Sequence, residues 1–336
     1  MRRITVACAL ILAIHVFVSD RSRAVELPAA KDLHNDAATT LAPFVDNQTL
    51  LVAHVDLNAF EAVKTIDWIT GVLGFSERSR DHIQSQAAPI SVVTQGLPKS
   101  QSVSVYIVIS LSDIASFSGG ARLPFFLVLP VDDRTPSIPI ATEARRELEK
   151  AWNRKVAQER VGEALIVGSQ ETIDRLKKVK PVARPEIAAA FKAVDDGALQ
   201  IAFIPSVEMR RLAEALFPEA PKQLGGGLTK TFTQGAIWSA IAIDLPPGQI
   251  AARLVIQSAD AAAATALDQQ LAIAIDAIAA LPSVRDGSPK FAEIAKRLAP
   301  KADGDQLKIE LTEENGDVTE GVKLLGPILQ AILNVK

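Results

Sequence analysis

The stretch that decides the fold is Ala236–Asp276, which reads AIWSAIAIDLPPGQIAARLVIQSADAAAATALDQQLAIAID. Its first part is an almost continuous apolar run, which predicts a buried strand over Ala236–Leu245. The Pro246-Pro247-Gly248 turn ends that strand, because two prolines remove two hydrogen-bond donors and glycine permits a tight reversal. The next run alternates polar and apolar residues, which predicts a half-exposed antiparallel strand over Ile250–Ser258.

A long alanine-rich helix is predicted to follow over Asp260–Leu281. The free N–H groups of its first turn need a side-chain oxygen, and either Ser258 or Asp260 offers one. Leucine and isoleucine then recur on one face at helical spacing, and Pro282 ends the pattern. The stretch is therefore a strand–turn–strand–helix unit, and a weaker copy of it is predicted near Val103–Trp152.

The remaining elements flank these two units. Short apolar or alternating runs predict further strands over Leu50–Asp56, Val103–Leu111, Leu123–Val131, Lys155–Val161, Ala164–Val167, Leu199–Ile204 and Gln306–Leu311. Helical periodicity predicts helices within Phe60–Leu73 and over Arg78–Thr94, Thr142–Trp152, Ser169–Val179, Glu186–Val194, Val207–Phe217, Gln223–Phe232, Pro289–Leu298 and Asp317–Leu333. Ser169 and Ser288 are the expected N-caps of two of these helices.

The order of elements repeats, so that each half of the chain reads β-α-(α)-β-β-α-β-α. Hairpins inside the β-α units indicate an α+β fold with mainly antiparallel mixed sheets, and the repeated order predicts an internal duplication. The proline-containing segment Lys180–Pro185 is the expected linker. We therefore divide the chain into a signal peptide (1–24), a polar leader (25–48), a first half (49–180) and a second half (181–336).

The first residues are typical of an export signal. Arg2 and Arg3 precede a mostly apolar run over Ile4–Val18, and Ser22-Arg23-Ala24 places small residues at the two positions that signal peptidase reads. The run is short for a membrane span, which needs about 20 residues, although a retained N-terminal anchor is the alternative. The sequence thus predicts an extracytoplasmic protein, periplasmic or secreted, with no transmembrane span in the mature chain.

Charge and cysteine content exclude several function classes. The 336-residue chain has a formal charge of −3, and removal of the predicted signal, with its four arginines and one aspartate, leaves −6. An acidic chain does not favour nucleic-acid binding by neutralisation of phosphates. The single cysteine, Cys8, lies inside the predicted signal, so the mature chain has no disulfide, thiol nucleophile or thiolate metal site.

Histidine and aspartate occur twice at a spacing of two residues, as His54-Val55-Asp56 and His34-Asn35-Asp36. Two such pairs together would supply four metal ligands. Nothing in the sequence brings the pairs together, and the favoured interpretation is structural: Asp56 caps the following turn, and His54 is a core-edge residue with satisfied hydrogen bonds. We therefore predict no metal site and no cofactor.

Three other motifs are also interpreted structurally. Gly225-Gly226-Gly227-Leu228-Thr229-Lys230-Thr231 lacks the glycine directly before lysine that a phosphate loop requires, so a flexible loop is favoured. Ser169 follows Gly168 at a strand-to-helix turn without the Gly-x-Ser-x-Gly pattern of a hydrolase, so helix capping is favoured. The acidic runs Asp132-Asp133, Asp195-Asp196 and Glu313-Glu314-Asn315-Gly316 are typical of turns.

Two segments carry a resemblance to other proteins. Leu-Val-Ala-His-Val-Asp-Leu-Asn-Ala-Phe (Leu51–Phe60) and Ala-Leu-Ile-Val-Gly-Ser-Gln-Glu-Thr-Ile-Asp-Arg-Leu (Ala164–Leu176) accompany the predicted signal. The design resembles the uncharacterised alanine-rich secreted proteins of planctomycete-type bacteria. This resemblance covers most of the chain in style, and it implies no activity or site.

The absence of catalytic motifs favours a non-catalytic binding or interaction module of the cell envelope. Such a module would bind an envelope protein or an apolar small molecule, in a groove between the halves. We nominate no catalytic, cofactor-binding or metal-binding residue from the sequence. The alternatives are a hydrolase with a dispersed site, built from residues such as His54, Asp56 and Asp132, and a purely structural envelope protein.

Overall fold

The structure, a computed structural model, describes residues 39–59, 62–73, 77, 103–116, 125–131, 137–178, 180–222, 225–245, 250–281, 284 and 290–323. The first half contains η1 (Ala42–Phe44), β1 (Thr49–Asp56), α3 (Ala62–Val72), β2 (Ser104–Ser110), α5 (Leu111–Ser116), β3 (Phe126–Pro130), α6 (Ser137–Trp152), β4 (Ala157–Val161), β5 (Ala164–Gly168) and α7 (Gln170–Leu176). The second half contains α8 (Pro185–Ala193), β6 (Leu199–Phe203), α9 (Val207–Leu216), α10 (Thr229–Gly235), β7 (Trp238–Asp244), β8 (Ala251–Gln257), α11 (Ala261–Ala279), α13 (Phe291–Arg297), β9 (Lys301–Asp303), β10 (Gln306–Thr312) and η3 (Glu313–Asn315).

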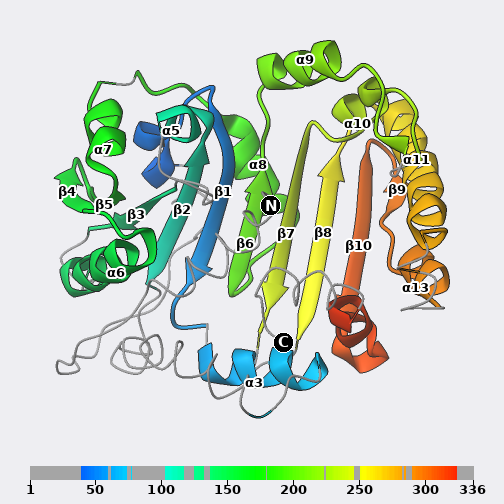
Figure 1. The fold of residues 1–336 in the computed structure, drawn as a ribbon, viewed down its shortest axis with the longest axis horizontal. Helices are drawn as coiled ribbons and strands as arrows, with labels where there is room; N and C mark the ends of the chain where they lie inside the picture. Colours follow the sequence, from blue (N-terminus) through cyan, green and yellow to red (C-terminus); the bar gives the residue numbers. More distant parts are fainter. Residues whose placement is uncertain are drawn as a thin grey trace.

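The strands form one ten-stranded sheet, which runs across the whole molecule (Figure 1). The strand order is β4-β5-β3-β2-β1-β6-β7-β8-β10-β9, and all described pairs of neighbouring strands are antiparallel. The predicted α+β class and the mainly antiparallel pairing are therefore confirmed. Both halves contribute to a single sheet, whereas the sequence had suggested mixed sheets in tandem.

The strand order reads the same from the middle of the sheet toward each edge. It is β1-β2-β3-β5-β4 in the first half and β6-β7-β8-β10-β9 in the second. The two halves meet where β1 pairs with β6, with Leu51 opposite Phe203 and Val55 opposite Leu199. This shared order is what an internal duplication requires, and the duplication itself stays a prediction.

Each face of the sheet has its own hydrophobic core, because alternate residues of a strand point to opposite faces. On one face, Ala53 and Ile107 belong to a cluster that includes residues of α6. On the other face, Val52 and Val108 belong to a cluster that includes residues of α7 and α8. A third cluster joins α11 to Leu307 of β10, at the far end of the sheet.

The end of the predicted polar leader belongs to the core. Leu41, Phe44 and Val45 are at most 3% exposed and pack in the same cluster as α7 and α8. Residues 39–48 are therefore part of the folded unit, and their apolar side chains bury them in the core.

Helix α6 begins earlier than predicted, and helix α10 begins later. Helix α6 starts at Ser137, not at Thr142, because Ser137 Oγ donates to the carbonyl oxygen of Pro130 at 2.6 Å and the first turn tolerates Pro139. Helix α10 starts at Thr229, not at Gln223. Its delay follows from Gly225, Gly226 and Gly227, whose φ angles of +84°, +66° and +88° are incompatible with a right-handed helix.

Three further differences concern short elements. Sequence reasoning missed α5 and the three-residue edge strand β9, which are too short to show a period. Helix α13 begins at Phe291, and its N-cap is Lys290, which makes no capping side-chain hydrogen bond. The predicted cap at Ser288 was therefore wrong. By contrast, Asp260 caps α11 by accepting a hydrogen bond from the Ala263 N–H at 2.8 Å.

Several predictions lie outside the described residues. They are the signal peptide and most of the leader, the pair His34 and Asp36, the helix Arg78–Thr94, the pair Asp132-Asp133, the turn at Pro246-Pro247-Gly248 and the end of the helix Asp317–Leu333. Among the residues that the structure does describe, no helix has the length and apolar character needed to cross a membrane.

Candidate functional site

His54 lies on β1 in the middle of the sheet, between β2 and β6. Its side chain is buried, with Nδ1 2.9 Å from Gln200 Oε1 and Nε2 2.9 Å from Ser104 Oγ. Its ring stacks on Tyr106, with ring centroids 5.1 Å apart. The interpretation of His54 as a core-edge residue with satisfied hydrogen bonds is therefore confirmed.

The hydrogen bonds of Gln200 determine which nitrogen of His54 carries the proton. Gln200 Nε2 donates to the carbonyl oxygen of Asp195 at 2.7 Å and lies 3.5 Å from that of Phe191. The amide oxygen must therefore face His54, and since it is only an acceptor, Nδ1 is the protonated nitrogen. Nε2 is then an acceptor for the Ser104 hydroxyl.

Ser104, His54 and Gln200 thus have the connectivity of a nucleophile, a base and an orienting group. Ser104 lines neither the hollow along α6 nor the hollow between α9 and α10. The three side chains join the adjacent strands β2, β1 and β6. We interpret them as a polar clamp across the centre of the sheet. Of the residues suggested for a dispersed hydrolase site, Asp132 lies outside the described residues.

Asp56 caps a turn, as predicted. Its Oδ1 accepts hydrogen bonds from the backbone N–H of Asn58 at 2.9 Å and of Ala59 at 3.4 Å. Within the part of the chain that the structure describes, no three His, Cys, Asp or Glu residues are arranged to hold a metal ion. The second His-x-Asp pair lies outside that part, so the structure does not place the two pairs together.

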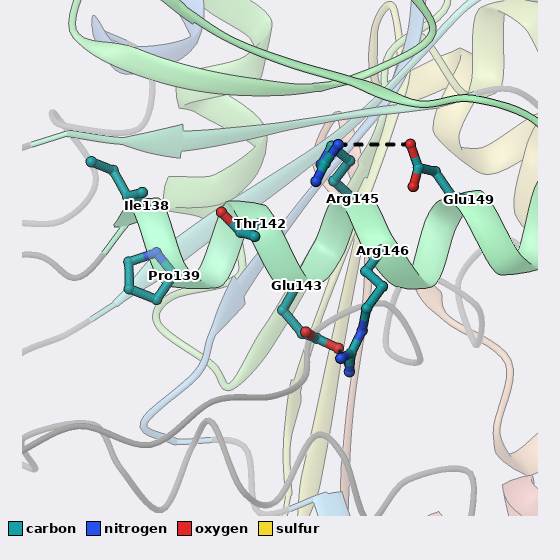
Figure 2. A pocket seen from close by; sticks show the side chains of 7 residues that line it. All are labelled: Ile138, Pro139, Thr142, Glu143, Arg145, Arg146 and Glu149. Carbon is teal, nitrogen blue, oxygen red and sulfur yellow. Dashed lines mark hydrogen bonds and ion pairs between the residues drawn. The ribbon is translucent and has the colours of Figure 1, made fainter.

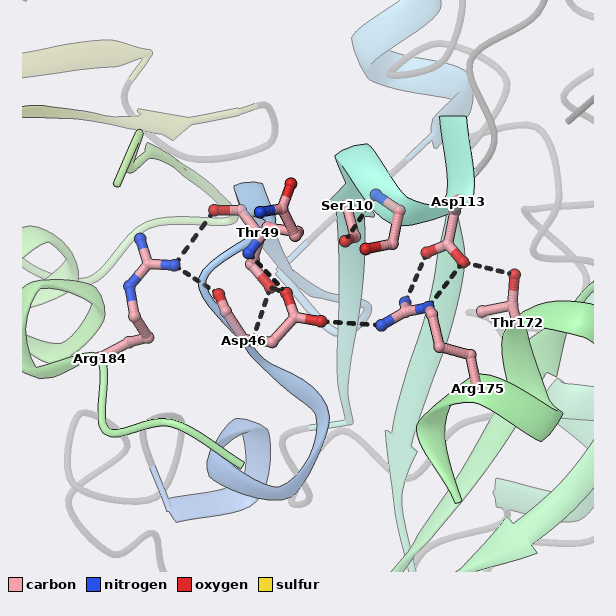
Figure 3. Close-up of polar contacts among 9 residues, drawn as sticks. Asp46, Thr49, Ser110, Asp113, Thr172, Arg175 and Arg184 are labelled. Carbon is pink, nitrogen blue, oxygen red and sulfur yellow. Dashed lines mark hydrogen bonds and ion pairs between the residues drawn. The ribbon is translucent and has the colours of Figure 1, made fainter. Parts of the chain in front are cut away.

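A buried network of charges joins the N-terminal segment to both halves (Figure 3). The guanidinium of Arg175 is shared between two carboxylates, at 2.9 Å from Asp46 Oδ2 and 2.7 Å from Asp113 Oδ2. Arg184 donates to the backbone carbonyl oxygens of Asp46 at 2.6 Å and Thr49 at 3.2 Å. Each of these charged groups has protein partners, so we interpret the network as structural.

The other motifs have the structural roles expected of them. Ser169 caps α7 by accepting a hydrogen bond from the Thr172 N–H at 3.0 Å. Asp195 has a φ of +55° in the turn before β6, and residues 313–315 form the short 3-10 helix η3. The glycines of Gly225–Thr231 form a loop, and Lys230 lies in the first turn of α10.

One hollow of about 550 Å³ lies along α6 (Figure 2). It is lined by Ile138, Pro139, Thr142, Glu143, Arg145, Arg146 and Glu149. Both of its arginines have acidic partners, because Arg146 contacts Glu143 and Arg145 lies 3.9 Å from Glu149. The hollow is therefore formally neutral and its cations are paired.

A second hollow, of about 510 Å³, lies between α9 and α10. It is lined by Val207, Arg210, Arg211, Glu214, Lys230, Thr233, Gln234, Ile237 and Ala259. Among the described residues, none of its three cations forms an ion pair within 4 Å. Its single carboxylate, Glu214, accepts a hydrogen bond from the Thr233 hydroxyl.

Arg210 has an incomplete set of partners in this hollow. Its Nη1 makes only a long contact, 3.4 Å, with the carbonyl oxygen of Thr233, and its buried Nε donates to no acceptor among the described residues. Burial lowers the pKa of the Arg210 guanidinium, and the nearby charges of Glu214, Glu186 and Glu208 oppose this. The group stays protonated, because arginine does not lose its proton in proteins.

Helix α9 exposes an apolar surface. Leu212, Leu216, Phe217 and Leu228, which we call the α9 apolar surface, are 56–65% exposed. They are four of the five most exposed large hydrophobic side chains in the described residues, the fifth being Ile138 on α6. Leu228 lies beside Phe217, because Thr229 donates to the backbone oxygens of Phe217 and Pro218.

Sequence reasoning placed the helix α9 correctly but nominated none of these residues. The pattern Val-Glu-Met-Arg-Arg-Leu-Ala-Glu-Ala-Leu, Val207–Leu216, is amphipathic, and such a helix ordinarily buries its apolar side. The observed helix has no buried residue. Whether the apolar face of a helix is exposed depends on how the helix packs in the folded protein. The sequence therefore shows the residues of the site but not their exposure.

No protein-family model, no curated protein and no solved structure matches this chain.

Proposed function

We propose that this protein is an exported, non-catalytic interaction module of the cell envelope, which binds a partner protein through the α9 apolar surface. The single observation that carries the proposal is that α9 is amphipathic and yet has no buried residue. Contiguous exposed apolar side chains are costly in water and mark interaction sites. Export is inferred from the predicted signal peptide.

The shape of the surface favours a protein groove as its binding site. Leu212 and Leu216 are one helical turn apart, which is the spacing of anchor residues that insert into an apolar groove. Phe217, the next residue, lies just beyond the helix end and is also exposed. Aromatic and aliphatic anchors of this kind contribute most of the binding free energy in helix-in-groove complexes.

The charges around the surface favour a protein over a lipid membrane. The exposed residues nearby carry both signs, with Glu208 and Glu219 alternating with Arg211 and Lys222. A rim of mixed sign is typical of protein–protein interfaces, whereas a helix that lies on an anionic membrane carries mostly Lys and Arg on its polar face.

The proposal is tested by site-specific photo-crosslinking in the native host. A photoreactive amino acid replaces Leu216 in one strain and Ile138 in another, because the two side chains are almost equally exposed, 62% and 65%. We expect position 216 to give one crosslinked species with a distinct extracytoplasmic protein and position 138 to give none. Leu212→Ser and Phe217→Ser should each weaken that adduct about tenfold, as expected when an anchor worth about 1.4 kcal/mol is lost.

Two results would overturn the proposal. One is the same set of adducts from positions 216 and 138, which would indicate non-specific collision. The other is an adduct of twice the chain mass that Leu212→Ser abolishes, which would assign the surface to self-association. Circular dichroism of the two serine variants serves as the control for folding, and both replaced side chains are exposed.

A further inference from the structure

The hollow between α9 and α10 concentrates positive charge in an acidic protein. Arg210, Arg211 and Lys230 line it together with one carboxylate, Glu214, so its formal charge is about +2, whereas the whole chain carries −3. The hollow along α6 is the natural comparison within the same molecule. There each arginine has a glutamate partner, and the lining charges cancel.

The cations of the α9–α10 hollow form no close ion pair. The carboxylates near them act at longer range, Glu208 on Arg211 and Glu214, Glu186 and Glu208 on Arg210. Among the described residues, no carboxylate lies within ion-pairing distance of Arg210, Arg211 or Lys230, and the Thr233 hydroxyl occupies Glu214. The Arg210 Nε is a buried donor without an acceptor. A buried donor left unsatisfied costs about 1–3 kcal/mol, which marks Arg210, a lining residue of the hollow, as incompletely partnered among the described residues.

We propose that this hollow binds a phosphate monoester, with the phosphate held by Arg210, Arg211 and Lys230. A phosphate monoester carries close to two negative charges near neutral pH, which matches the formal charge of the lining. The planar fork of arginine suits the oxygens of phosphate, and lysine adds a point charge. The site is separate from the α9 apolar surface, so this inference does not depend on the proposed partner protein.

The rest of the lining indicates that the phosphate belongs to a larger molecule. About 510 Å³ is more space than a bare phosphate fills, and it falls within the usual range of small-molecule sites. Val207, Ile237 and Ala259 provide an apolar wall for an organic group. Recognition here uses side chains of two helices, so it differs from a phosphate loop, in which backbone N–H groups of glycines bind the ligand.

Isothermal titration calorimetry of the purified protein at low ionic strength tests the inference. Phenyl phosphate is the probe, because it combines a phosphate dianion with a small apolar body. Three comparison compounds are titrated separately. Inorganic phosphate lacks the apolar group, benzoate carries one negative charge in place of two, and phenol is uncharged. We expect saturable 1:1 binding of phenyl phosphate, binding at least about tenfold weaker for the other three, and loss of affinity as salt is added.

Charge-removing variants locate the site. Arg211→Gln and Lys230→Gln change exposed side chains and preserve the fold, and each should weaken phenyl phosphate binding about tenfold, the effect of one charge-assisted hydrogen bond. Arg210→Gln should have the largest effect. Arg145→Gln, in the neutral hollow along α6, is the matched control and should leave the affinity unchanged.

Three outcomes would overturn the inference. The first is no saturable binding of phenyl phosphate by the folded protein. The second is equal weakening by Arg145→Gln and Lys230→Gln, which would indicate general attraction of anions. The third is equal affinity for inorganic phosphate and phenyl phosphate, which would assign the hollow to free phosphate. If Arg210→Gln does not fold, the two exposed variants decide the question. None of these results affects the crosslinking test of the α9 apolar surface.

Discussion

At the scale of single residues, Gln200 controls the chemistry of the centre of the sheet. Both ends of its amide are held, the nitrogen by the carbonyl oxygen of Asp195 and the oxygen by His54. We therefore predict that neutral His54 carries its proton on Nδ1, which long-range ¹⁵N–¹H correlation spectra of the imidazole will report directly. Gln200→Leu should lower the free energy of unfolding by about 1–3 kcal/mol in urea, because it leaves a buried Nδ1–H without an acceptor.

Ser104→Ala is the matched comparison, because it removes the partner of the other ring nitrogen at a position that is only partly buried. It should cost less than Gln200→Leu, since water can replace the hydroxyl. A spectrum that places the proton on Nε2, or a Gln200→Leu variant as stable as the parent, would contradict the proposed hydrogen-bond arrangement.

The sequence could predict only half of this arrangement. The period of a strand puts His54 and Asp56 on one face, and the polar residue at a strand end explains the capping role of Asp56. The partner Gln200 lies 146 residues away along the chain, and nothing local marks it. The same holds for the partly buried ion pair of Arg175 and Asp113, which are 62 residues apart. Such contacts follow from strand order, which no local pattern contains.

At the scale of secondary-structure elements, the contact between α10 and α11 depends on the absence of a side chain. Gly235 is buried at the end of α10, and a Cβ atom there would lie 2.6 Å from the Cβ of Leu267, which is 3% exposed. Gly235→Ala should therefore lower the free energy of unfolding by about 1–3 kcal/mol, the usual cost of overpacking a rigid core. Urea unfolding measures this difference.

Gly71 in α3 is the control for this prediction, because a Cβ atom there would meet nothing within 4 Å. Gly71→Ala should stabilise the protein by about 0.5–1 kcal/mol, since alanine loses less backbone entropy in a helix. If Gly235→Ala lowers the free energy of unfolding and Gly71→Ala raises it, close packing against Leu267, and not helix propensity, determines the residue at position 235. If both substitutions change the free energy of unfolding in the same direction, this explanation is contradicted.

The sequence predicted most elements because their signals are local. Apolar periodicity, the caps Ser169 and Asp260, and Pro185 in a first turn all act within a few residues. The errors have equally local causes. Gly225–Gly227 delayed the start of α10, and the helix predicted to start at Thr142 begins at Ser137, with Pro139 in its first turn.

At the scale of the whole molecule, the halves are joined by a strand pair and a shared core. Five residue pairs link β1 to β6, and the cluster beneath α7 and α8 includes Val52 and Val108 of the first half and Ala202, Ala240 and Val255 of the second. The sequence indicated two halves with the same order of elements. It did not indicate that their first strands would pair, because an apolar pattern predicts that a strand is buried and does not specify which strands lie beside it.

This continuity predicts a single cooperative unfolding transition. Trp152 packs against Phe125 in the first half, and Trp238 lies on β7 in the second. Variants that lack Trp68 of α3 and retain only one of these two tryptophans therefore report separately on each half. Because the core crosses the junction, both reporters should give the same midpoint and slope in urea. Ala202→Asp, which places a charge at a fully buried position of β6, should move both midpoints down by the same amount. If the halves were independent, only the Trp238 curve would move, and the curve reported by Trp152 would keep its original midpoint.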